Sequence, residues 1–345
     1  MIFLGVKLGQ LLKRFNIGKI VDVSFFSNKV VVIDALPTIY EMLAMIRDKR
    51  GLYLVDSKGR VTSHLVGLFY RICRMITLGI KPIFVFDGPP HPLKLRELET
   101  RKKEKERFQK KYIEAVLSGK YDEAKKLGKR AMFVNDEMIK SAKQLIKFFG
   151  LPIINAPHDG EAQAAYIVSK GEAFAVASRD WDCLLYGAPR LVMDLKFSPT
   201  TVYRPRLYEL NEVLSKLNLS HEQLIDLALL LGTDYNPEGF KGIGVVKAYN
   251  LIRKYGSLEA LVNKSVIIWK FDVSLDEIKD LFLHPIVSTK YSIMFEQPKY
   301  DKIVDFLVNE YNFSKKRVLN ELNELRKKIS IDFKAKQMGL DSFFE

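Results

Sequence analysis

Cysteine is almost absent from this sequence. Cys73 and Cys183 are the only two among 345 residues, and both have apolar neighbours. Such cysteines are typical of reduced core residues, so a disulfide framework of the kind found in small secreted proteins is excluded. The five histidines are scattered, and none has zinc-ligand spacing with another histidine or a cysteine. We therefore expect an intracellular, cytoplasmic protein without a zinc site.

Long hydrophobic runs are also missing, and acidic residues are too few to balance the basic ones. No apolar run approaches the roughly 20 residues that a membrane span needs. The chain has 55 Lys and Arg against 41 Asp and Glu, which gives a formal net charge of +14. An excess of this size favours a polyanionic partner. Because no membrane segment is present, nucleic acid is a better partner than an anionic membrane.

Short apolar runs alternate with amphipathic stretches along the first half of the chain. The runs lie at residues 30–34 (VVVID), 83–87 (IFVFD) and 173–178 (AFAVAS), and polar turns bound them. Such runs are typical of buried strands in a parallel sheet. Residues 63–78 and 135–149 have helical periodicity. The pattern predicts an α/β domain with a mainly parallel central sheet flanked by helices.

One segment of the predicted domain is much more charged than the rest. Residues 94–130 contain 14 basic and seven acidic residues, with few apolar positions. A pair of core helices is therefore not expected there. We interpret the segment as a helical insertion that contacts nucleic acid and orders on binding. The alternative is a solvated helical hairpin with no such role.

Acidic residues recur where apolar segments end. Carboxylates at the carboxyl ends of parallel strands converge on one edge of the sheet, where open α/β folds place their sites. A single aspartate in such a place is more often a helix cap than a ligand. Repetition at five segments favours a shared site. The seven carboxylates are Asp34, Asp87, Asp159, Glu161, Asp180, Asp182 and Asp234.

So many clustered acids cannot all stay ionised without positive charge, because mutual repulsion raises their pKa values. Ligands that are all oxygen select hard cations, so we expect two Mg²⁺ ions, with Mn²⁺ as a substitute. Two such ions about 4 Å apart activate a water and stabilise a leaving oxygen in phosphodiester hydrolysis. This chemistry fits both the acidic site and the basic composition.

A glycine-rich loop lies between two further predicted helices, within residues 220–255. Residues 239–244 read GFKGIG, and a helix begins near Val246. Exposed N–H groups at a helix start bind phosphate without regard to base sequence. The spacing is similar to that of a helix-hairpin-helix, and a plain turn is the alternative. The candidate DNA-binding residues of this loop are Lys241, Gly242, Gly244 and Lys247.

The last residues of the chain form a motif of their own. A basic helix pattern lies at residues 314–328. We expect one main domain at residues 1–328, followed by a flexible tail at 329–345. Two adjacent phenylalanines near the end suggest an apolar contact. One helical turn could present three apolar side chains to a pocket, and a tail folded onto its own core is the alternative. The motif comprises Gln337, Leu340, Phe343 and Phe344.

Four stretches together resemble the flap endonucleases and related structure-specific 5′ nucleases. They lie at residues 56–65 (DSKGRVTSHL), 85–88 (VFDG), 160–166 (GEAQAAY) and 231–237 (LGTDYNP). The resemblance runs through about residues 30–290 and resumes in the tail. It implies cleavage near the base of a 5′ single-stranded DNA flap by a two-metal mechanism, in replication and repair. A 5′→3′ exonuclease activity is implied as well.

The resemblance also implies roles for individual residues. The basic pair Lys94 and Arg101 corresponds to the residues that contact the scissile phosphate, at the base of an arch spanning residues 94–130. Tyr40 corresponds to the aromatic that stacks on a base, and Arg47 and Arg71 to basic positions near DNA. The tail corresponds to a sliding-clamp-binding motif, and we expect a monomer. The family's metal-site carboxylates correspond to Asp34, Asp87, Glu161, Asp180, Asp182 and Asp234.

Position 159 departs from the family pattern. Asp159 stands where the pattern has glutamate. One methylene less shortens its reach, so a metal contact there can pass through a bridging water. The altered residue supports a rival hypothesis of another class, a non-catalytic DNA-binding protein tethered to a clamp. A second rival is a 5′→3′ exonuclease or bubble-cutting repair nuclease on the same scaffold.

Overall fold

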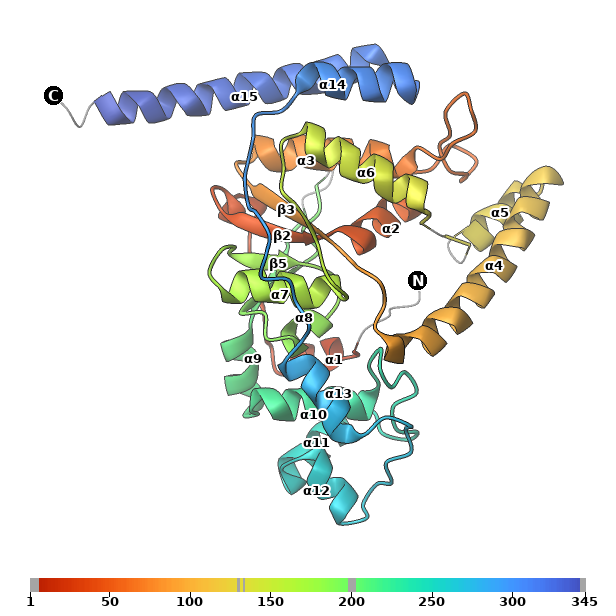
Figure 1. Ribbon diagram of the computed structural model, residues 1–345, viewed down its shortest axis with the longest axis vertical. Coiled ribbons are helices and arrows are strands. Elements are labelled where there is room, and N and C mark those ends of the chain that lie inside the picture. The colour runs from red at the N-terminus through yellow and green to blue at the C-terminus, as the bar shows by residue number, and fades with distance from the viewer. Residues whose placement is uncertain (1–5, 129–130, 133, 198–202, 342–345) are drawn as a thin grey trace.

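A seven-stranded sheet forms the centre of the molecule (Figure 1). The computed structural model describes residues 6–128, 131–132, 134–197 and 203–341. The strand order is β1-β7-β6-β5-β2-β3-β4, with β2 to β6 parallel and β7 antiparallel to both β6 and β1. The mainly parallel sheet is therefore confirmed. The strands are β1 (Lys19–Ile20), β2 (Val30–Asp34), β3 (Lys81–Phe86), β4 (Ile153–Asn155), β5 (Ala175–Ala177), β6 (Arg190–Met193) and β7 (Arg206–Glu209).

The central strands are apolar on both faces because helices cover both. Successive side chains of a strand point to opposite faces. In β2, Val31 and Ile33 join one hydrophobic core, whereas Val32 joins the other. The same alternation in β3 sends Phe84 to the first core and Val85 to the second. This burial explains why these strands are continuous apolar runs in the sequence.

The helices fall into two layers (Figure 1). α3 and α6 begin and end within one residue of the ranges expected for them. The first layer contains α2 (Ala35–Met45), α3 (Ser63–Thr77), α6 (Asp136–Phe148), α14 (Tyr300–Val304), α15 (Lys315–Asp341), the 3₁₀ turn η1 (Val23–Phe26) and the π-helix η3 (Asp305–Glu310). The second layer contains α1 (Gly9–Arg14), α7 (Gly160–Ser169), α8 (Asp182–Leu185), α9 (Leu210–Leu217), α10 (His221–Leu231), α11 (Val245–Tyr255), α12 (Leu258–Asn263) and α13 (Leu275–Leu283).

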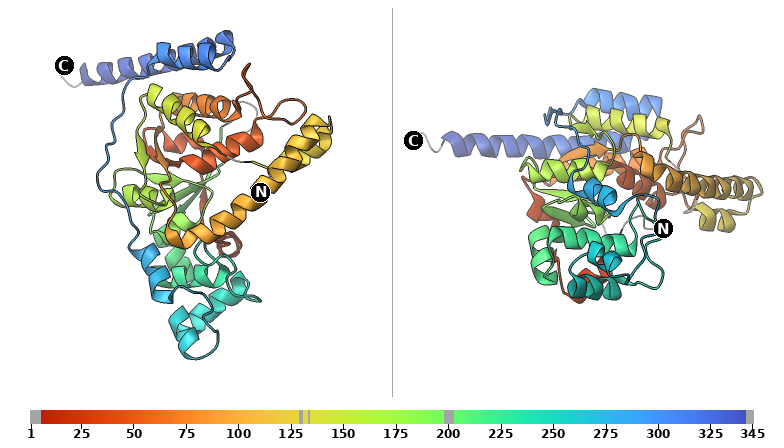
Figure 2. Two further views of the ribbon diagram at one scale, coloured as in Figure 1. Left: turned by 45° about the vertical axis from the view of Figure 1, so that its right-hand side comes forward. Right: turned by 60° about the horizontal axis from the view of Figure 1, so that its bottom comes forward.

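Two helices stand away from this body. After the 3₁₀ turn η2 (Pro92–Lys94), α4 (Leu95–Leu117) and α5 (Tyr121–Gly128) pack on each other and project outward (Figure 2). The charged segment 94–130 is thus mostly helical. Ala115 and Ala124 are buried, but several larger apolar side chains are exposed, and Leu117 is 81% exposed. Together these features place α4 and α5 outside the two hydrophobic cores.

The C-terminal helix is longer than the sequence pattern predicts. α15 packs on α3 and continues as one helix to Asp341, across the predicted boundary at residue 329. Within the described residues, no helix is long and apolar enough to cross a membrane.

Candidate active site

The sheet edge gathers the predicted carboxylates. Asp34 ends β2, Asp87 directly follows β3, and Asp180 follows β5 by three residues. These three strands are parallel neighbours, so their carboxyl ends meet at one edge. The remaining acids lie at the starts of α7 and α8 and in the loop after α10. The structure therefore brings all seven predicted carboxylates to the same side of the fold.

Burial and mutual repulsion raise the pKa values of most of these acids. The pKa of Glu161 is raised to about 8, first by burial and then by the charge of Asp87. Burial and the charge of Asp234 raise the pKa of Asp182 to about 7. The pKa of Asp34 is raised well above its usual value by burial and by Glu161. These shifts show that the site concentrates negative charge away from water.

Hydrogen bonds hold several of the acids in place. The Gly160 N–H donates to Asp87 Oδ1 at 2.6 Å, and the Ser178 hydroxyl donates to Asp34 Oδ2 at 3.1 Å. A Cβ at position 160 would lie 2.8 Å from Asp87 Oδ1, so only glycine allows this approach. The sequence reasoning assigned no role to Gly160 or Ser178, although both lie beside predicted ligands.

Lys94 supplies positive charge inside the acidic cluster. Its Nζ lies 2.8 Å from Asp159 Oδ1 and 3.6 Å from Asp234 Oδ2, and its side chain is only 12% exposed. Asp159 Oδ2 accepts hydrogen bonds from the hydroxyls of Tyr186 and Tyr235, each at 2.8 Å. The two tyrosines were not among the predicted site residues. Their contacts with Asp159 span 27 and 76 residues of sequence, a separation that no local pattern reveals.

The donor set suits hard cations, although the side chains do not yet form a coordination sphere. Within the described parts of the chain, no three His, Cys, Asp or Glu side chains are arranged to hold one metal ion. The clustered acids offer only oxygen ligands. Their raised pKa values mark an excess of buried negative charge that divalent cations would relieve. The chemistry of the donors therefore fits Mg²⁺ or Mn²⁺.

Comparison with known proteins assigns the family. The model of the XPG N-terminal domain matches residues 4–108, and that of the XPG I-region matches residues 150–234. Flap endonuclease 1 of Pyrococcus furiosus is 43% identical over 99% of this chain and 100% of its own length. The chain belongs to the flap endonuclease family. It is a structure-specific 5′ nuclease of archaeal type by this similarity.

Solved structures of the family share the fold. Flap endonuclease-1 from Methanococcus jannaschii matches with a TM-score of 0.75 and 36% identity, covering 95% of this chain and all of that one. The catalytic core of Rad2, solved in complex with a DNA substrate, matches with a TM-score of 0.73 at 23% identity. It covers 93% of this chain and all of that one. At 23% identity, the similarity to Rad2 shows only that the two proteins share a fold.

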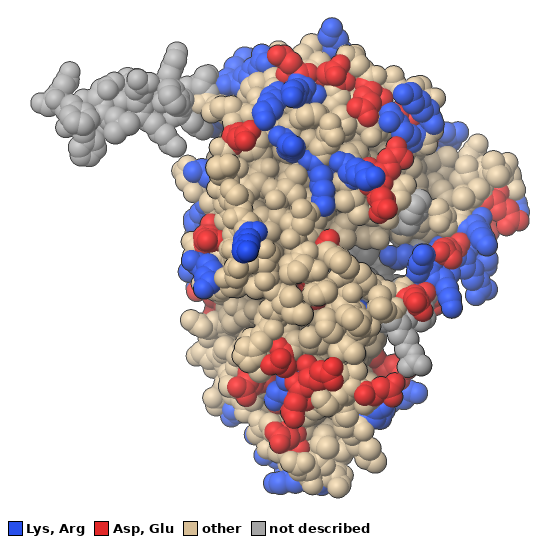
Figure 3. All heavy atoms as spheres, viewed as in Figure 1, with Lys and Arg blue, Asp and Glu red and all other residues tan. Residues whose placement is uncertain are grey.

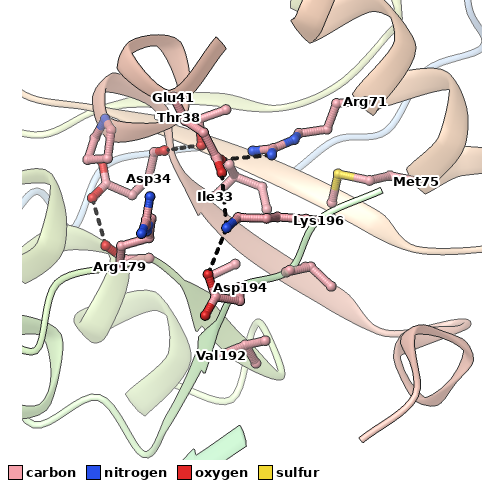
Figure 4. A pocket seen from close by; sticks show the side chains of 14 residues that line it. Ile33, Asp34, Thr38, Glu41, Arg71, Met75, Arg179, Val192, Asp194 and Lys196 are labelled. Atoms are coloured by element: carbon pink, nitrogen blue, oxygen red, sulfur yellow. Dashed lines mark hydrogen bonds and ion pairs between the residues drawn. The ribbon is translucent and has the colours of Figure 1, made fainter. Parts of the chain in front are cut away.

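A small cavity of about 40 Å³ lies beside Asp34 of this flap endonuclease family member (Figure 4). Arg71 points into it from α3 and pairs with Glu41 Oε2 at 2.8 Å. Lys196 lies between Glu41 Oε1 at 3.6 Å and Asp194 Oδ1 at 2.9 Å. Arg71, predicted to lie near DNA, thus lines the cavity beside Asp34 and is paired with the Glu41 carboxylate.

Two other predicted DNA contacts lie between the sheet and the projecting helices. Tyr40 is half-buried on α2, and Lys105 of α4 donates to its hydroxyl at 3.3 Å. The Arg47 guanidinium lies 3.7 Å from the ring centroid of Tyr53 and donates to the Gly128 carbonyl at 3.2 Å. Arg47 therefore connects α5 to the body of the protein.

The glycine loop joins α10 to α11 with its backbone open on one side. A Cβ at Gly242 or Gly244 would meet no atom within 4 Å. Gly244 is the N-cap of α11 and provides no side chain to cap it. Lys247 Nζ lies 3.4 Å from the Gly242 carbonyl, and Lys241 is exposed beside it. The start of α11 therefore has no side-chain cap, and the space beside Gly242 and Gly244 is open.

The remaining predicted residues lie partly outside the described structure. Arg101 lies on α4, where the structure describes the backbone of this residue but not its side chain. Gln337 and Leu340 lie within α15, likewise without described side chains, and Phe343 and Phe344 lie outside the described residues.

Figure 3 shows basic side chains gathered on α4 and α5, and acidic ones over α13.

Proposed function

We propose that this protein is a 5′ flap endonuclease that hydrolyses a phosphodiester near the base of a single-stranded 5′ flap. The observation that carries the proposal is the acidic cluster at the sheet edge, which lies with Lys94 at the foot of α4. The relatives named flap endonuclease 1 support the substrate class. Replication and repair of DNA are the processes in which such flaps are removed, and a 5′→3′ exonuclease activity accompanies the main one.

The proposed cofactors are two Mg²⁺ ions, which Mn²⁺ can replace. Bound divalent cations supply activation of the attacking water and stabilisation of the leaving oxygen. The raised pKa values of the buried acids mark negative charge that bound cations would relieve, and this relief favours their binding. The carboxylates proposed to hold them are Asp34, Asp87, Glu161, Asp180, Asp182 and Asp234.

The residues around the cluster position the DNA. Lys94 and Arg101 place positive charge against the scissile phosphate, where charge develops as the bond breaks. Tyr40 stacks on a base beside the cut once Lys105 releases it. Arg47 and Arg71 interact with the phosphate backbone, and the α4–α5 pair is the arch over the flap.

Two further contacts complete the proposal. Backbone N–H groups at Gly242 and Gly244, with Lys241 and Lys247, bind phosphates of the duplex at the start of α11. Residues 337–344 dock on a sliding clamp through one helical turn, and the nuclease itself is a monomer. The open backbone and uncapped helix start support the first of these contacts.

The first test is cleavage of a 5′-labelled double-flap DNA in Mg²⁺, with Asp182→Ala as the matched variant. We expect the wild type to release a short product that ends at the flap junction and the variant to release none. Nick and bubble substrates in parallel would reveal an exonuclease or a bubble-cutting enzyme instead. Tight binding without product in Mg²⁺ or Mn²⁺ would contradict the proposal and favour a non-catalytic protein.

A further inference from the structure

We propose that Asp159 is a positioning residue that holds Lys94 against the acidic cluster through a frame of two tyrosines, and that it does not ligate a divalent cation. This inference deepens the proposed function and rests on it for the role of Lys94. It differs from the expectation that all seven carboxylates are metal ligands.

Both oxygens of Asp159 already have protein donors. Oδ1 accepts from Lys94 at 2.8 Å, and Oδ2 accepts from Tyr186 and Tyr235, each at 2.8 Å. A carboxylate has about four lone-pair positions, so three of them are used here. A cation that bound Asp159 directly would have to share Oδ1 with the Lys94 ammonium group or displace a buried hydroxyl from Oδ2. None of these donors is a water that could leave freely.

A helix-cap role does not account for this geometry. Asp159 is the N-cap residue of α7, but its side chain makes no capping hydrogen bond to that helix. The carboxylate is directed instead across the site to Lys94, which lies 65 residues earlier in the chain. The side chain therefore bonds to the distant Lys94 and not to the backbone N–H groups of α7, which are the usual partners of an N-cap aspartate.

The two tyrosines form a rigid frame behind Asp159. Their hydroxyls lie 3.1 Å from each other, and each of the two residues is only 9% exposed. Both rings pack against Phe282 of α13, with centroids 5.1 Å and 5.4 Å away. Because neither ring can rotate away from this packing, the hydroxyls fix the carboxylate orientation.

Lys94 is held from the other side as well. Its Nζ lies 4.7 Å from the ring centroid of Tyr235 and 3.6 Å from Asp234 Oδ2. A lysine side chain has several rotatable bonds, and fixing it in advance lowers the conformational entropy that is lost during the reaction. Asp159 is the nearest of these partners, so its loss should free Lys94 most.

Manganese binding tests the inference without reference to cleavage. Mn²⁺ titrations followed by electron paramagnetic resonance would compare wild type, Asp159→Asn and Glu161→Gln. We expect Asp159→Asn to bind the wild-type number of ions with affinity within about threefold, and Glu161→Gln to lose about tenfold or more. Loss of an ion, or a tenfold loss of affinity, in Asp159→Asn would overturn the inference.

Single-turnover cleavage of a flap substrate tests the link to Lys94. If Asp159 acts through Lys94, Lys94→Ala/Asp159→Asn cleaves no more slowly than Lys94→Ala, although each single variant is slower than wild type by about tenfold or more. Multiplicative effects would overturn the inference. A wild type that cleaves no flap would contradict the proposed function, and the manganese titration would still decide whether Asp159 is a ligand.

Tyr186→Phe and Tyr235→Phe guard against a folding defect in Asp159→Asn, because each keeps the ring and removes only a hydroxyl. In the wild-type background we expect each to slow single-turnover cleavage by about three- to tenfold with little change in KM. In the Lys94→Ala background, neither substitution should change the rate of single-turnover cleavage. Equal slowing in both backgrounds would show a structural role only and would overturn the inference.

Discussion

The acidic cluster and the α4–α5 pair meet at Lys94, yet they are built in opposite ways. Three of the carboxylates end or follow strands whose side chains enter two hydrophobic cores, as Val32 and Ile33 of β2 show. The α4–α5 pair lies outside both cores and exposes Leu117 almost fully. Core packing sets the geometry of the first region before any ligand arrives, whereas the second depends on a few contacts at its base.

The two regions also use charge differently. In the cluster, burial makes each charge costly, so its acids bind protons tightly or pair with Lys94. On α4 and α5 the charges are mostly exposed, where solvent screening reduces each interaction to a fraction of a kcal/mol. The comparison implies that single substitutions act strongly in the cluster and weakly on the projecting helices.

The largest effect is expected when a buried acid is neutralised. Glu161→Gln should lower flap cleavage in Mg²⁺ by on the order of 10³-fold, because it removes a proposed cation ligand. The same change should stabilise the metal-free protein at pH 8 by roughly 2–4 kcal/mol, since a buried charge is lost. Activity assays and urea unfolding would measure the two effects. Glu324→Gln, which changes an exposed acid on α15, is the control and should change neither cleavage nor stability.

The pH dependence of stability should reveal the same buried acids. The pKa of Glu161 is about 8 in the folded protein against an ordinary 4.5, so across pH 5–8 the folded state holds a proton that the unfolded chain has lost. The free energy of unfolding of the metal-free protein therefore falls as pH rises through this window. Asp182, with a pKa of about 7, contributes in the same direction.

Thermal unfolding in chelator from pH 5 to pH 8 would show this decline. Mg²⁺ at 100 times its dissociation constant should restore about 2.7 kcal/mol at pH 8. A stability that rises with pH in the chelated protein would contradict the raised pKa values.

The sequence predicts the strands that carry the acidic cluster better than it predicts the antiparallel edge of the sheet. Strands buried on both faces are apolar runs, and an acid directly after such a run lies at the sheet edge, so Asp34 and Asp87 were placed correctly. The strand β1 has only two residues and shows no period, and β7 pairs with it across 188 residues. Neither strand was therefore foreseen.

Contacts between side chains from distant elements were also beyond the sequence. Nothing local to Tyr186 indicates that its hydroxyl reaches Asp159, because the contact depends on how α7 and α8 pack. The same holds for Arg47, because the sequence does not show that its guanidinium lies against Tyr53 and the Gly128 carbonyl. Residue type predicted the chemistry of these positions, and only packing determines their partners.

A smaller, local effect is expected at the base of the projecting helices. Arg47→Ala removes the hydrogen bond to the Gly128 carbonyl and the contact with the Tyr53 ring. Amide hydrogen exchange in residues 121–128 should then speed up by about tenfold, with no change in β2 or β3. Lys49→Ala, at an exposed neighbour, is the control. Unchanged exchange in α5 would show that other contacts hold the pair.

The smallest effect is expected at the far end of α4. Leu117 is 81% exposed, whereas Leu145 of α6 is fully buried in a core. Leu117→Ser should change the free energy of unfolding by no more than about 0.5 kcal/mol. The same substitution at Leu145 should cost about 3–5 kcal/mol, because it leaves a cavity and buries a hydroxyl. Urea unfolding compares the two directly. A cost above about 1 kcal/mol at Leu117 would mean that α4 packs on another surface in solution, and the contrast between the two regions would then fail.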